Sequence, residues 1–406
     1  MAERQDVVAA KMLCDGTAFR TSVSGEPRAP LCGMGVCMEC RATVNGVAHQ
    51  RTCQSIVGGG GGLKPIPEQL DVLVVGAGPA GMAALWAASQ SSARIGLVDD
   101  NPAAGGQIWR NSIPAEWAAR VDTLPVFAGT RIFGIGGKPN SLWAERGGER
   151  VELRYGKLIV ATGARERFLP FPGWTLPGVF GAGGLQALVK GGFPVAGKRV
   201  VVAGSGPLLL AVAAYLKERG AKVVLIAEQT TVARRNQFVK LLLKSPAKLK
   251  QAMALRWQLM GVPYQMSSWV TRAEGDGQVS RVVLQNGRSM ECDALACGFG
   301  LAPNTELAAL LGCRIDDGYV AVNHAQQTTV DGVYCAGEPT GIGGLDKSIA
   351  EGLIAGYSAT GQVEKARAEF PKRARANLFS ASTGHGVCAA RRTAVDGEAG
   401  YDRVPL

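Results

Sequence analysis

The sequence of 406 residues is poor in histidine and aromatic residues, and it lacks long apolar runs. It has three histidines, which are far apart along the chain, namely His49, His324 and His385. No Ser-His-Asp, metal-hydrolase or kinase motif is evident, so the residues do not indicate hydrolysis or phosphoryl transfer. No apolar run reaches the ~18 residues of a membrane-spanning helix, and the N-terminus lacks the basic and apolar regions of a signal peptide. We therefore expect a cytoplasmic protein.

Basic residues outnumber acidic ones, 44 to 33, which gives a formal net charge of +11. The charge is spread along the chain, with a denser stretch at 365–375. Nucleic-acid binding would need such a patch together with a recognition element, and none is visible, so we expect no nucleic-acid partner. A solvated basic surface explains the charge, and peripheral contact with the anionic inner face of a membrane is the alternative.

Four of the ten cysteines follow a spacing that is typical of iron–sulfur ligands. In a cytoplasmic protein, cysteines serve more often as ligands or buried thiols than as disulfides. The pattern C-x4-C-x2-C, followed by a fourth cysteine after twelve further residues, is that of plant-type 2Fe–2S ferredoxins. Zinc sites more often use two C-x2-C pairs, and unligated buried thiols are the third interpretation. We expect a 2Fe–2S cluster whose thiolate ligands are Cys32, Cys37, Cys40 and Cys53.

Residues 1–57, which contain these cysteines, are few for a ferredoxin-type β-grasp domain. The hydrophobic pattern predicts one helix at 6–13 and two strands at 42–44 and 48–52. The opening hairpin of such a domain is missing from this pattern, so we expect a small and incomplete β-grasp domain. Its cluster site is then completed by the adjoining domain or by a partner, or the cluster is labile. A glycine run and a proline segment follow and predict a linker at 58–69.

An apolar strand, a glycine turn and a helix follow the linker in immediate succession. Residues 70–75 indicate a buried parallel strand, and residues 82–90 indicate a helix. Between them, Gly76, Gly78 and Gly81 form G-x-G-x-x-G, whose glycines permit a tight turn, close approach of a pyrophosphate and close helix packing. The phosphates would lie at the helix N-terminus. A dinucleotide site is the favoured interpretation, and a tight turn without a ligand is the alternative.

Further acids and glycine turns extend this pattern. The strand at 94–98 ends at Asp99, 18 residues after Gly81, which is close to the spacing of an acid that binds a ribose hydroxyl. Gly105 and Gly106 form a second turn close to where a flavin would lie. These features favour one cofactor that extends across several turns.

Two turns far along the chain complete the expected cofactor site. A strand that begins at Gly156 ends in a turn containing Thr162 and Gly163. Near the C-terminal end, another apolar strand is followed by Gly337 and Glu338. A carboxylate at that place would suit a ribitol hydroxyl.

A second strand and glycine turn, at 198–206, departs from the first motif. It keeps Gly204 and Gly206, but Leu209 occupies the third glycine position, where close approach of the helix is harder. Glu228 lies at about the place of a ribose acid. NAD(P) binding at this turn is therefore doubtful, and a retained domain with a blocked or repurposed site is favoured.

From about residue 71 to residue 362 the sequence resembles flavoproteins related to thioredoxin reductase, which contain two dinucleotide-binding domains. The resemblance rests on GAGPAG, the ATG turn, GSGP, and AGE in place of the usual AGD. It implies an α/β fold with two Rossmann-like FAD/NAD(P)-binding domains, the second inserted in the first. The implied parts are an FAD-binding domain at 70–170 and 298–365, an NAD(P)-binding-like domain at 171–297, and a tail at 366–406 that we expect to be disordered.

The same resemblance implies FAD as the cofactor of the first motif. It carries FAD contacts over to Gly76, Gly78, Gly81, Asp99, Gly163, Gly337 and Glu338. We also expect contacts from neighbours in the same turns, namely Pro79, Ala80, Asp100, Gly106, Gln107 and Thr162.

More narrowly, CGMGVCMEC joined to GGQIWR and GSGPLLLAVAA resembles the electron-transferring subunits of hydrogen cyanide synthase, opine oxidases and D-hydroxyproline dehydrogenase. This resemblance implies an FAD- and 2Fe–2S-dependent oxidoreductase that works with a second flavoprotein subunit, which oxidises a small amino acid or amine. The alternative is a stand-alone NAD(P)H:acceptor reductase, and a non-catalytic scaffold is the third hypothesis. Such relatives commonly hold another cluster in a cysteine-rich tail, whereas the tail here contains only Cys388.

Overall fold

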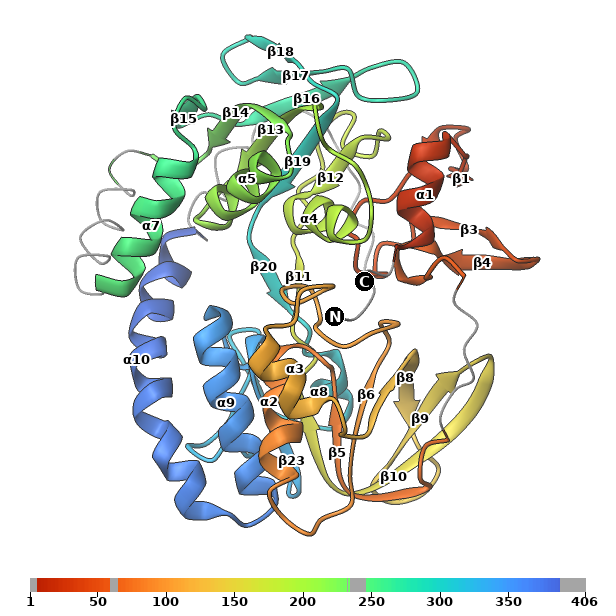
Figure 1. The fold of residues 1–406 in the computed structure, drawn as a ribbon, viewed down its shortest axis with the longest axis vertical. Coiled ribbons are helices and arrows are strands. Elements are labelled where there is room, and N and C mark those ends of the chain that lie inside the picture. The colour runs from red at the N-terminus through yellow and green to blue at the C-terminus, as the bar shows by residue number, and fades with distance from the viewer. Residues whose placement is uncertain (1–5, 59–64, 232, 234–245, 388–406) are drawn as a thin grey trace.

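The computed structural model describes residues 6–58, 65–231, 233 and 246–387. Figure 1 shows an outer α/β domain in the lower half, an inserted α/β domain in the upper half, and an N-terminal segment, residues 6–58, beside the inserted domain. The outer domain is made from two stretches of chain because the inserted domain interrupts it. Two short strands, β11 (Ala164–Glu166) and β20 (Leu301–Pro303), pair antiparallel where the chain leaves the outer domain and returns to it.

The outer domain is built on a mixed sheet, which has seven strands in the described part of the chain. They are β5 (Gln69–Val75), β6 (Ile95–Asp99), β7 (Val126–Ala128), β8 (Thr130–Ile135), β9 (Ser141–Arg146), β10 (Glu149–Val160) and β23 (Val333–Cys335). Their order is β7-β6-β5-β10-β9-β8, and β23 also pairs with β10. The long strand β10 pairs in parallel with β5 and β23 and antiparallel with β9. Because β5 lies inside this sheet, its apolar residues are buried, as the sequence predicts.

Three helices, α2 (Pro79–Ala88), α9 (Gly344–Ala359) and α10 (Val363–Val387), run side by side along the outer domain (Figure 1). Helices α2 and α9 approach so closely that a Cβ atom added to Gly352 would overlap the carbonyl oxygen of Ala80. The close packing of these two helices therefore requires small residues at their contact. The remaining elements of this domain are α3 (Ala115–Val121), α8 (Glu306–Leu310), β21 (Ile315–Asp316), β22 (Tyr319–Val320) and the 3-10 turn η2 (Glu338–Thr340).

The expected disordered tail at 366–406 is corrected in its first part, which forms most of α10. Ala366 is buried and Phe370 packs against the same apolar cluster as α2 and α9. Alanine, arginine, lysine and glutamate are strong helix formers. This polar segment therefore forms a helix, which is stabilised where its few apolar residues pack against the outer domain. Residues 388–406 lie outside the described residues.

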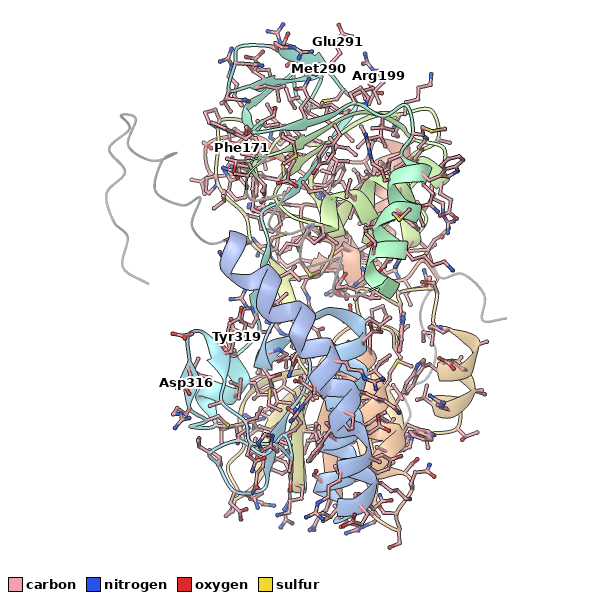
Figure 2. All side chains as sticks on the ribbon, turned by 90° about the vertical axis from the view of Figure 1, so that its left-hand side faces the viewer. Phe171, Arg199, Met290, Glu291, Asp316 and Tyr319 are labelled. Atoms are coloured by element: carbon pink, nitrogen blue, oxygen red, sulfur yellow. The ribbon has the colours of Figure 1, made fainter. Side chains whose placement is uncertain are left out.

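The inserted domain has a parallel sheet in the order β12-β19-β13-β14-β15. Its strands are β12 (Val179–Gly181), β13 (Arg199–Gly204), β14 (Lys222–Glu228), β15 (Tyr264–Met266) and β19 (Ala294–Gly298), and its helices are α4 (Ala182–Lys190), α5 (Leu208–Glu218) and α7 (Pro246–Gln258). A small antiparallel sheet, β16 (Val270–Glu274), β17 (Arg281–Leu284) and β18 (Ser289–Glu291), lies at its outer end. Figure 2 shows Arg199 beside Glu291 there, with 2.6 Å between guanidinium and carboxylate atoms.

The N-terminal segment is held against the inserted domain and has little core of its own. It contains α1 (Val8–Asp15), β1 (Arg20–Thr21), β2 (Pro27–Arg28), β3 (Arg41–Val44), β4 (Val47–Arg51) and the 3-10 turn η1 (Thr52–Gln54). Its strands form two separate two-stranded ladders. Val7, Cys40 and Cys53 belong to the same buried cluster as Leu185 and Leu188 of α4. The inserted domain therefore completes the core of this short segment.

Helix α4 meets the N-terminal segment through backbone contacts. The amide of Gly181 donates to the carbonyl of Leu31 at 2.9 Å. A Cβ atom added to Gly33 would lie 2.9 Å from the carbonyl oxygen of Gly184, and one added to Gly184 would lie 2.5 Å from that of Leu31. Neither glycine has room for a side chain, so the loop around Cys32 lies directly on the start of α4.

None of the helices in the described ranges combines the length and the apolar character that crossing a lipid bilayer requires.

We predict that Gly352→Ala destabilises the outer domain, because its Cβ would force α2 and α9 apart. Overpacking of this kind costs about 1–3 kcal/mol. Urea unfolding of the purified protein should show a lower midpoint for this variant. Gly134→Ala is the matched control, because a Cβ added there meets no atom within 4 Å. Equal midpoints for the two variants would contradict the packing argument.

Candidate functional site

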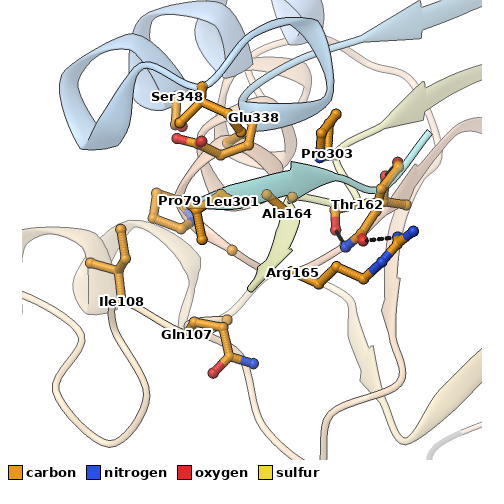
Figure 3. A pocket seen from close by; sticks show the side chains of 18 of the residues that line it. Pro79, Gln107, Ile108, Thr162, Ala164, Arg165, Leu301, Pro303, Glu338 and Ser348 are labelled. Carbon is orange, nitrogen blue, oxygen red and sulfur yellow. Dashed lines mark hydrogen bonds between the residues drawn. The ribbon is translucent and has the colours of Figure 1, made fainter. Parts of the chain in front are cut away.

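A cleft of about 2340 Å³ lies where the outer domain, the inserted domain and the N-terminal segment meet. Figure 3 shows part of its wall, with Glu338 and Ser348 on one side, Gln107 and Ile108 on another, and Arg165 opposite. The cleft is therefore a shared space of all three parts and is large enough for an extended dinucleotide.

The first glycine turn forms the floor of this cleft in the outer domain. Gly76 has φ +107, a conformation that L side chains rarely adopt, and a Cβ there would overlap the carbonyl of Ala161. Gly81 is packed against Gly76 behind the turn, while Gly76, Gly78, Pro79 and Ala80 line the cleft. Helix α2 begins at Pro79, so the free N–H groups of its first turn are available to a phosphate.

Asp99 and Asp100 follow β6 at the edge of the cleft, and they have different partners. The amide of Ala77 and both the amide and the side-chain nitrogen of Asn101 donate to the Asp99 carboxylate, the latter two at 2.7 Å. Burial raises the pKa of Asp99, and these hydrogen bonds oppose the shift. The Asp100 carboxylate instead pairs with Arg51 of the N-terminal segment at 3.1 Å. The Asp99 carboxylate thus ties the first glycine turn to Asn101, while Asp100 connects two parts of the chain.

The turn at Gly106 and Gln107 lies against the first glycine turn. A Cβ added to Gly106 would lie 2.9 Å from the Cα of Gly78. Gly106 and Gln107 both line the cleft. Trp109, two residues further along the chain, is 4% exposed and packs against Trp117 in the core.

Thr162 and Gly163 line the cleft between the two domains. The Thr162 hydroxyl donates to the carbonyl of Asn304 at 2.6 Å, and the Asn304 side chain donates back to the carbonyl of Thr162 at 2.8 Å. Arg165 donates to the side-chain oxygen of Asn304 at 2.7 Å (Figure 3). These bonds fix the turn to β20, which returns the chain to the outer domain.

Glu338 lines the cleft, and one of its carboxylate oxygens has no hydrogen-bond partner among the described residues. Its Oε1 atom accepts from the amide of Gly344 at 2.9 Å, whereas Oε2 is buried and has no hydrogen-bond partner among the described residues. Burial raises the pKa of this carboxyl. A buried polar oxygen without a partner is costly, and a ligand hydroxyl donated to it would remove that cost. This part of the site fits the expected ribitol contact.

A buried ion pair supports Gly337 and Glu338 from behind. Lys347 and Glu351, whose side chains are 5% and 4% exposed, lie 2.7 Å apart. Glu351 accepts from the amide of Gly337 at 2.9 Å and from the Thr340 hydroxyl at 2.7 Å. Lys347 also donates to the carbonyl of Gly337 at 3.1 Å. Both polar backbone groups of Gly337 are thus held by this pair.

The four expected cluster ligands lie together as two pairs of thiols. Cys32, Cys40 and Cys53 are buried, Cys37 is half-buried, and all four are free of disulfides. A hydrogen bond with Cys37 lowers the pKa of Cys32 to about 6, and one with Cys53 lowers the pKa of Cys40 to about 7. The amide of Met34 also donates to the Cys32 sulfur at 3.3 Å.

The pairing of these thiols suits a two-iron cluster. A 2Fe–2S cluster is held by four thiolates, so each of its two irons takes two of them, and the pairs Cys32–Cys37 and Cys40–Cys53 match that need. The residues between the ligands, including Met34, Gly35 and Val36, line the cleft.

The second glycine turn differs from the first in its backbone. Gly206 has φ +104, whereas Gly78, at the same place in the first turn, has φ -74. Glu228 accepts from the amides of Gly206 at 3.1 Å and Thr230 at 2.9 Å, whereas Asp99 accepts from Ala77, one position earlier in its turn. Leu209 is buried, and a Cβ added to Gly298 would lie 3.0 Å from its side chain. The inserted domain therefore accommodates Leu209 by a glycine on the neighbouring strand, and the turn still lines the cleft through Gly206.

Several polar residues at the site were not found from the sequence. Glu166, a buried acid on β11, accepts from the amides of Gly183 and Gly184 at 2.8 and 3.0 Å, and burial raises its pKa to about 7. The i, i+4 spacing of Lys347 and Glu351 was the one available signal for that pair. For Glu166 no local pattern was available.

Arg110 and His324 also contribute to the site. Arg110 donates to the carbonyl of Gly33 at 2.7 Å and so reaches the cluster loop from the outer domain. His324 lines the cleft, and Arg373 of α10 contacts its ring nitrogen at 3.1 Å. Arg110 ends the run GGQIWR, but its partner lies too far away in sequence for any spacing rule.

Comparison with known proteins gives two family matches. The pattern of the pyridine nucleotide-disulphide oxidoreductase family matches residues 70–360, and that of the 2Fe-2S iron-sulfur cluster binding domain matches residues 1–61. The HcnB subunit of hydrogen cyanide synthase from Pseudomonas aeruginosa is 31% identical over 346 residues, which cover 75% of this chain and 74% of that protein. One of the opine oxidase subunits from Agrobacterium tumefaciens is 29% identical over 326 residues, which cover 71% and 65%.

Solved structures confirm the fold. L-proline dehydrogenase from P. horikoshii superposes with a TM-score of 0.66 at 19% identity, over 91% of this chain and 73% of that one. Thioredoxin reductase from T. acidophilum superposes with a TM-score of 0.56 at 22% identity, over 73% and 99%. The predicted fold class, with two Rossmann-like domains and a 2Fe–2S segment, is thereby confirmed.

The expected cofactors, FAD and a 2Fe–2S cluster, agree with both family matches. The chain belongs to the pyridine nucleotide-disulphide oxidoreductase family and is an FAD-dependent oxidoreductase with a 2Fe–2S domain at its N-terminal end.

Proposed function

We propose that this chain is the electron-transferring subunit of an amine or amino-acid dehydrogenase of the opine, glycine or hydroxyproline type. The observation that carries the proposal is the shared cleft, in which the cluster loop and the first glycine turn line one space. The relatives from hydrogen cyanide synthase and opine oxidase are both named as subunits, which supports a partner. A second flavoprotein subunit would oxidise the small amino acid or amine, and this chain would pass the electrons onward.

The residues of the outer domain would hold FAD along the cleft. The N-terminus of α2 and the turn at Gly76 and Gly78 suit the pyrophosphate, Asp99 suits the adenosine ribose, and Glu338 suits the ribitol. Gly106, Gln107, Thr162 and Gly163 would enclose the rest of the cofactor. Bound FAD would supply two-electron chemistry, and a 2Fe–2S cluster carries single electrons. Together the two cofactors would link a two-electron oxidation to one-electron transfer.

The four cysteines would hold the cluster beside this cleft. Their pairing would supply two thiolates to each iron, and the amide of Met34, which donates to the Cys32 sulfur, would help to set the potential of the cluster. We further propose a cytoplasmic location, with electrons leaving through peripheral contact with the membrane respiratory chain.

A stand-alone NAD(P)H:acceptor reductase is the second candidate. The position of Glu228 at the end of β14, beside the second glycine turn, favours it, because a dinucleotide-binding domain carries an acid at that place. Leu209 argues against this second candidate, because it occupies the position of the third glycine in the dinucleotide-binding motif.

We predict that neither NADH nor NADPH bleaches the flavin of the isolated chain under anaerobic conditions, whereas the amino-acid substrate does so in the presence of the partner subunit. Stopped-flow absorbance measures both. Leu209→Ala tests whether the leucine is the obstacle. Rapid bleaching of the unaltered chain by a nicotinamide nucleotide, without a partner, would establish the second candidate.

We predict that Cys53→Ser removes the cluster and leaves the flavin in place, because the thiolates and the flavin turns belong to different parts of the chain. Iron content should fall from about two atoms per chain, the content of one 2Fe–2S cluster, to nearly none, with the flavin absorbance retained. Cys14→Ser is the matched control, because Cys14 is exposed and outside the pattern. Full iron content in the Cys53→Ser protein would refute the ligand assignment.

We predict that Glu351→Gln weakens flavin retention. It leaves the buried Lys347 charge uncompensated, and breaking such a pair costs about 3–5 kcal/mol. The hydrogen bond from the Gly337 amide would also weaken, because a neutral amide oxygen is a poorer acceptor than a carboxylate. Flavin released during gel filtration should increase relative to the unaltered chain. Glu364→Gln, at an exposed pair on α10, is the control. Equal retention in both variants would show that the buried pair has no role at the site.

A further inference from the structure

Two arginines connect the cluster loop to the outer domain. Arg110 comes from the outer domain and donates to the carbonyl of Gly33, next to Cys32, at 2.7 Å. Its second guanidinium nitrogen donates to the side-chain oxygen of Asn101 at 2.9 Å, and Asn101 in turn donates to Asp99. One chain of hydrogen bonds thus leads from the expected ribose acid to the cluster loop.

Arg51 makes the other connection, from the N-terminal segment to Asp100 at 3.1 Å. Its charge is paired directly with a carboxylate. The two guanidinium hydrogen bonds of Arg110 described above go to neutral acceptors. Neither of these hydrogen bonds neutralises the positive charge of Arg110, so this charge can stabilise negative charge on the neighbouring cluster ligands.

This charge lies near the cluster loop, because Arg110 donates to the carbonyl of Gly33, the residue that follows Cys32. Burial lowers the pKa of Arg110, and the negative charges of Cys53, Asp99, Cys32 and Asp100 oppose that shift. Lys190 of α4 is the cationic neighbour; its ammonium donates to the carbonyl of Ile108 at 2.5 Å, and its own pKa is lowered to about 8, mainly by burial. An arginine stays protonated in such a setting, so a fixed positive charge lies beside the cluster ligands.

A charge in that place affects the electron equilibrium of a cluster. A one-electron reduction adds negative charge to a centre that already carries four thiolates, and net charge is one determinant of its potential. A half-buried cation stabilises the reduced form more than it would in water, because the effective dielectric constant is lower. Lysine would carry the same charge but lacks the planar fork that reaches two acceptors at once.

We infer that Arg110 is a positioning residue that raises the reduction potential of the 2Fe–2S cluster and fixes the cluster loop to the FAD-binding domain. The inference rests on the proposed function, in which reduced flavin gives one electron at a time to the oxidised cluster. No bond to Arg110 forms or breaks in that transfer, and Arg110 exchanges no proton. The arginine makes the transfer toward the cluster more favourable.

The test is an anaerobic redox titration of the full-length, cofactor-loaded chain, with the reduced cluster followed by electron paramagnetic resonance. Arg110→Gln should shift the electron equilibrium at least tenfold toward the oxidised cluster, which is a fall of ~59 mV for a one-electron couple. Arg110→Lys should give a smaller fall, because the charge is kept but the shorter side chain cannot hold both acceptors. Arg51→Gln is the control and should give a smaller shift than Arg110→Gln.

The outcomes separate this inference from the proposed function. An unaltered chain without a reducible cluster would overturn both. A normal cluster in the unaltered chain with the same potential in Arg110→Gln would overturn the role of Arg110 alone. If the glutamine variant does not assemble a cluster, Arg110→Lys decides: a potential below that of the unaltered chain supports the role, and an equal or higher potential refutes it.

Discussion

The contact on which the rest of the site depends is that between the start of helix α4 and the loop that carries Cys32. Backbone meets backbone there, since Gly33 and Gly184 leave no room for side chains. Glu166 accepts the amides of Gly183 and Gly184, so the helix N-terminus is satisfied by an acid from the connecting strand β11. Cluster loop, inserted domain and domain connection are thereby fixed to one another, and the cleft takes its shape from all three.

Several ionisable side chains around the cleft are largely shielded from solvent. Lys347 and Glu351 neutralise each other while they hold Gly337. Asp99 and Glu338 are buried acids whose pKa values are raised by desolvation. Burying such groups lowers the free energy of unfolding unless each group has hydrogen-bond or ionic partners. A polar ligand bound along the outer domain would offset this cost by hydrogen-bonding to these groups.

The parts of this site that could be predicted were local in sequence. Residues 70–75 were predicted as a strand and β5 spans Gln69–Val75, because an apolar run beside a glycine turn is decided by its own residues. The four cysteines were predicted as ligands from their spacing, and the structure places them together as two pairs. Arg110 and Gly33 are 77 residues apart, and no local rule joins them. The helix at 363–387 also escaped prediction, because its stability comes from packing against α9.

Cys40 and Cys53 share one buried cluster with α4 and α5 of the inserted domain. Any ligand that binds only the folded state stabilises it, and metal binding is coupled to folding when the ligands come from such a core. Iron bound to these thiolates would therefore stabilise the inserted domain as well as the N-terminal segment. Loss of the cluster would then destabilise a domain that supplies no ligand to it, and would affect the outer domain less, because its buried cluster is separate.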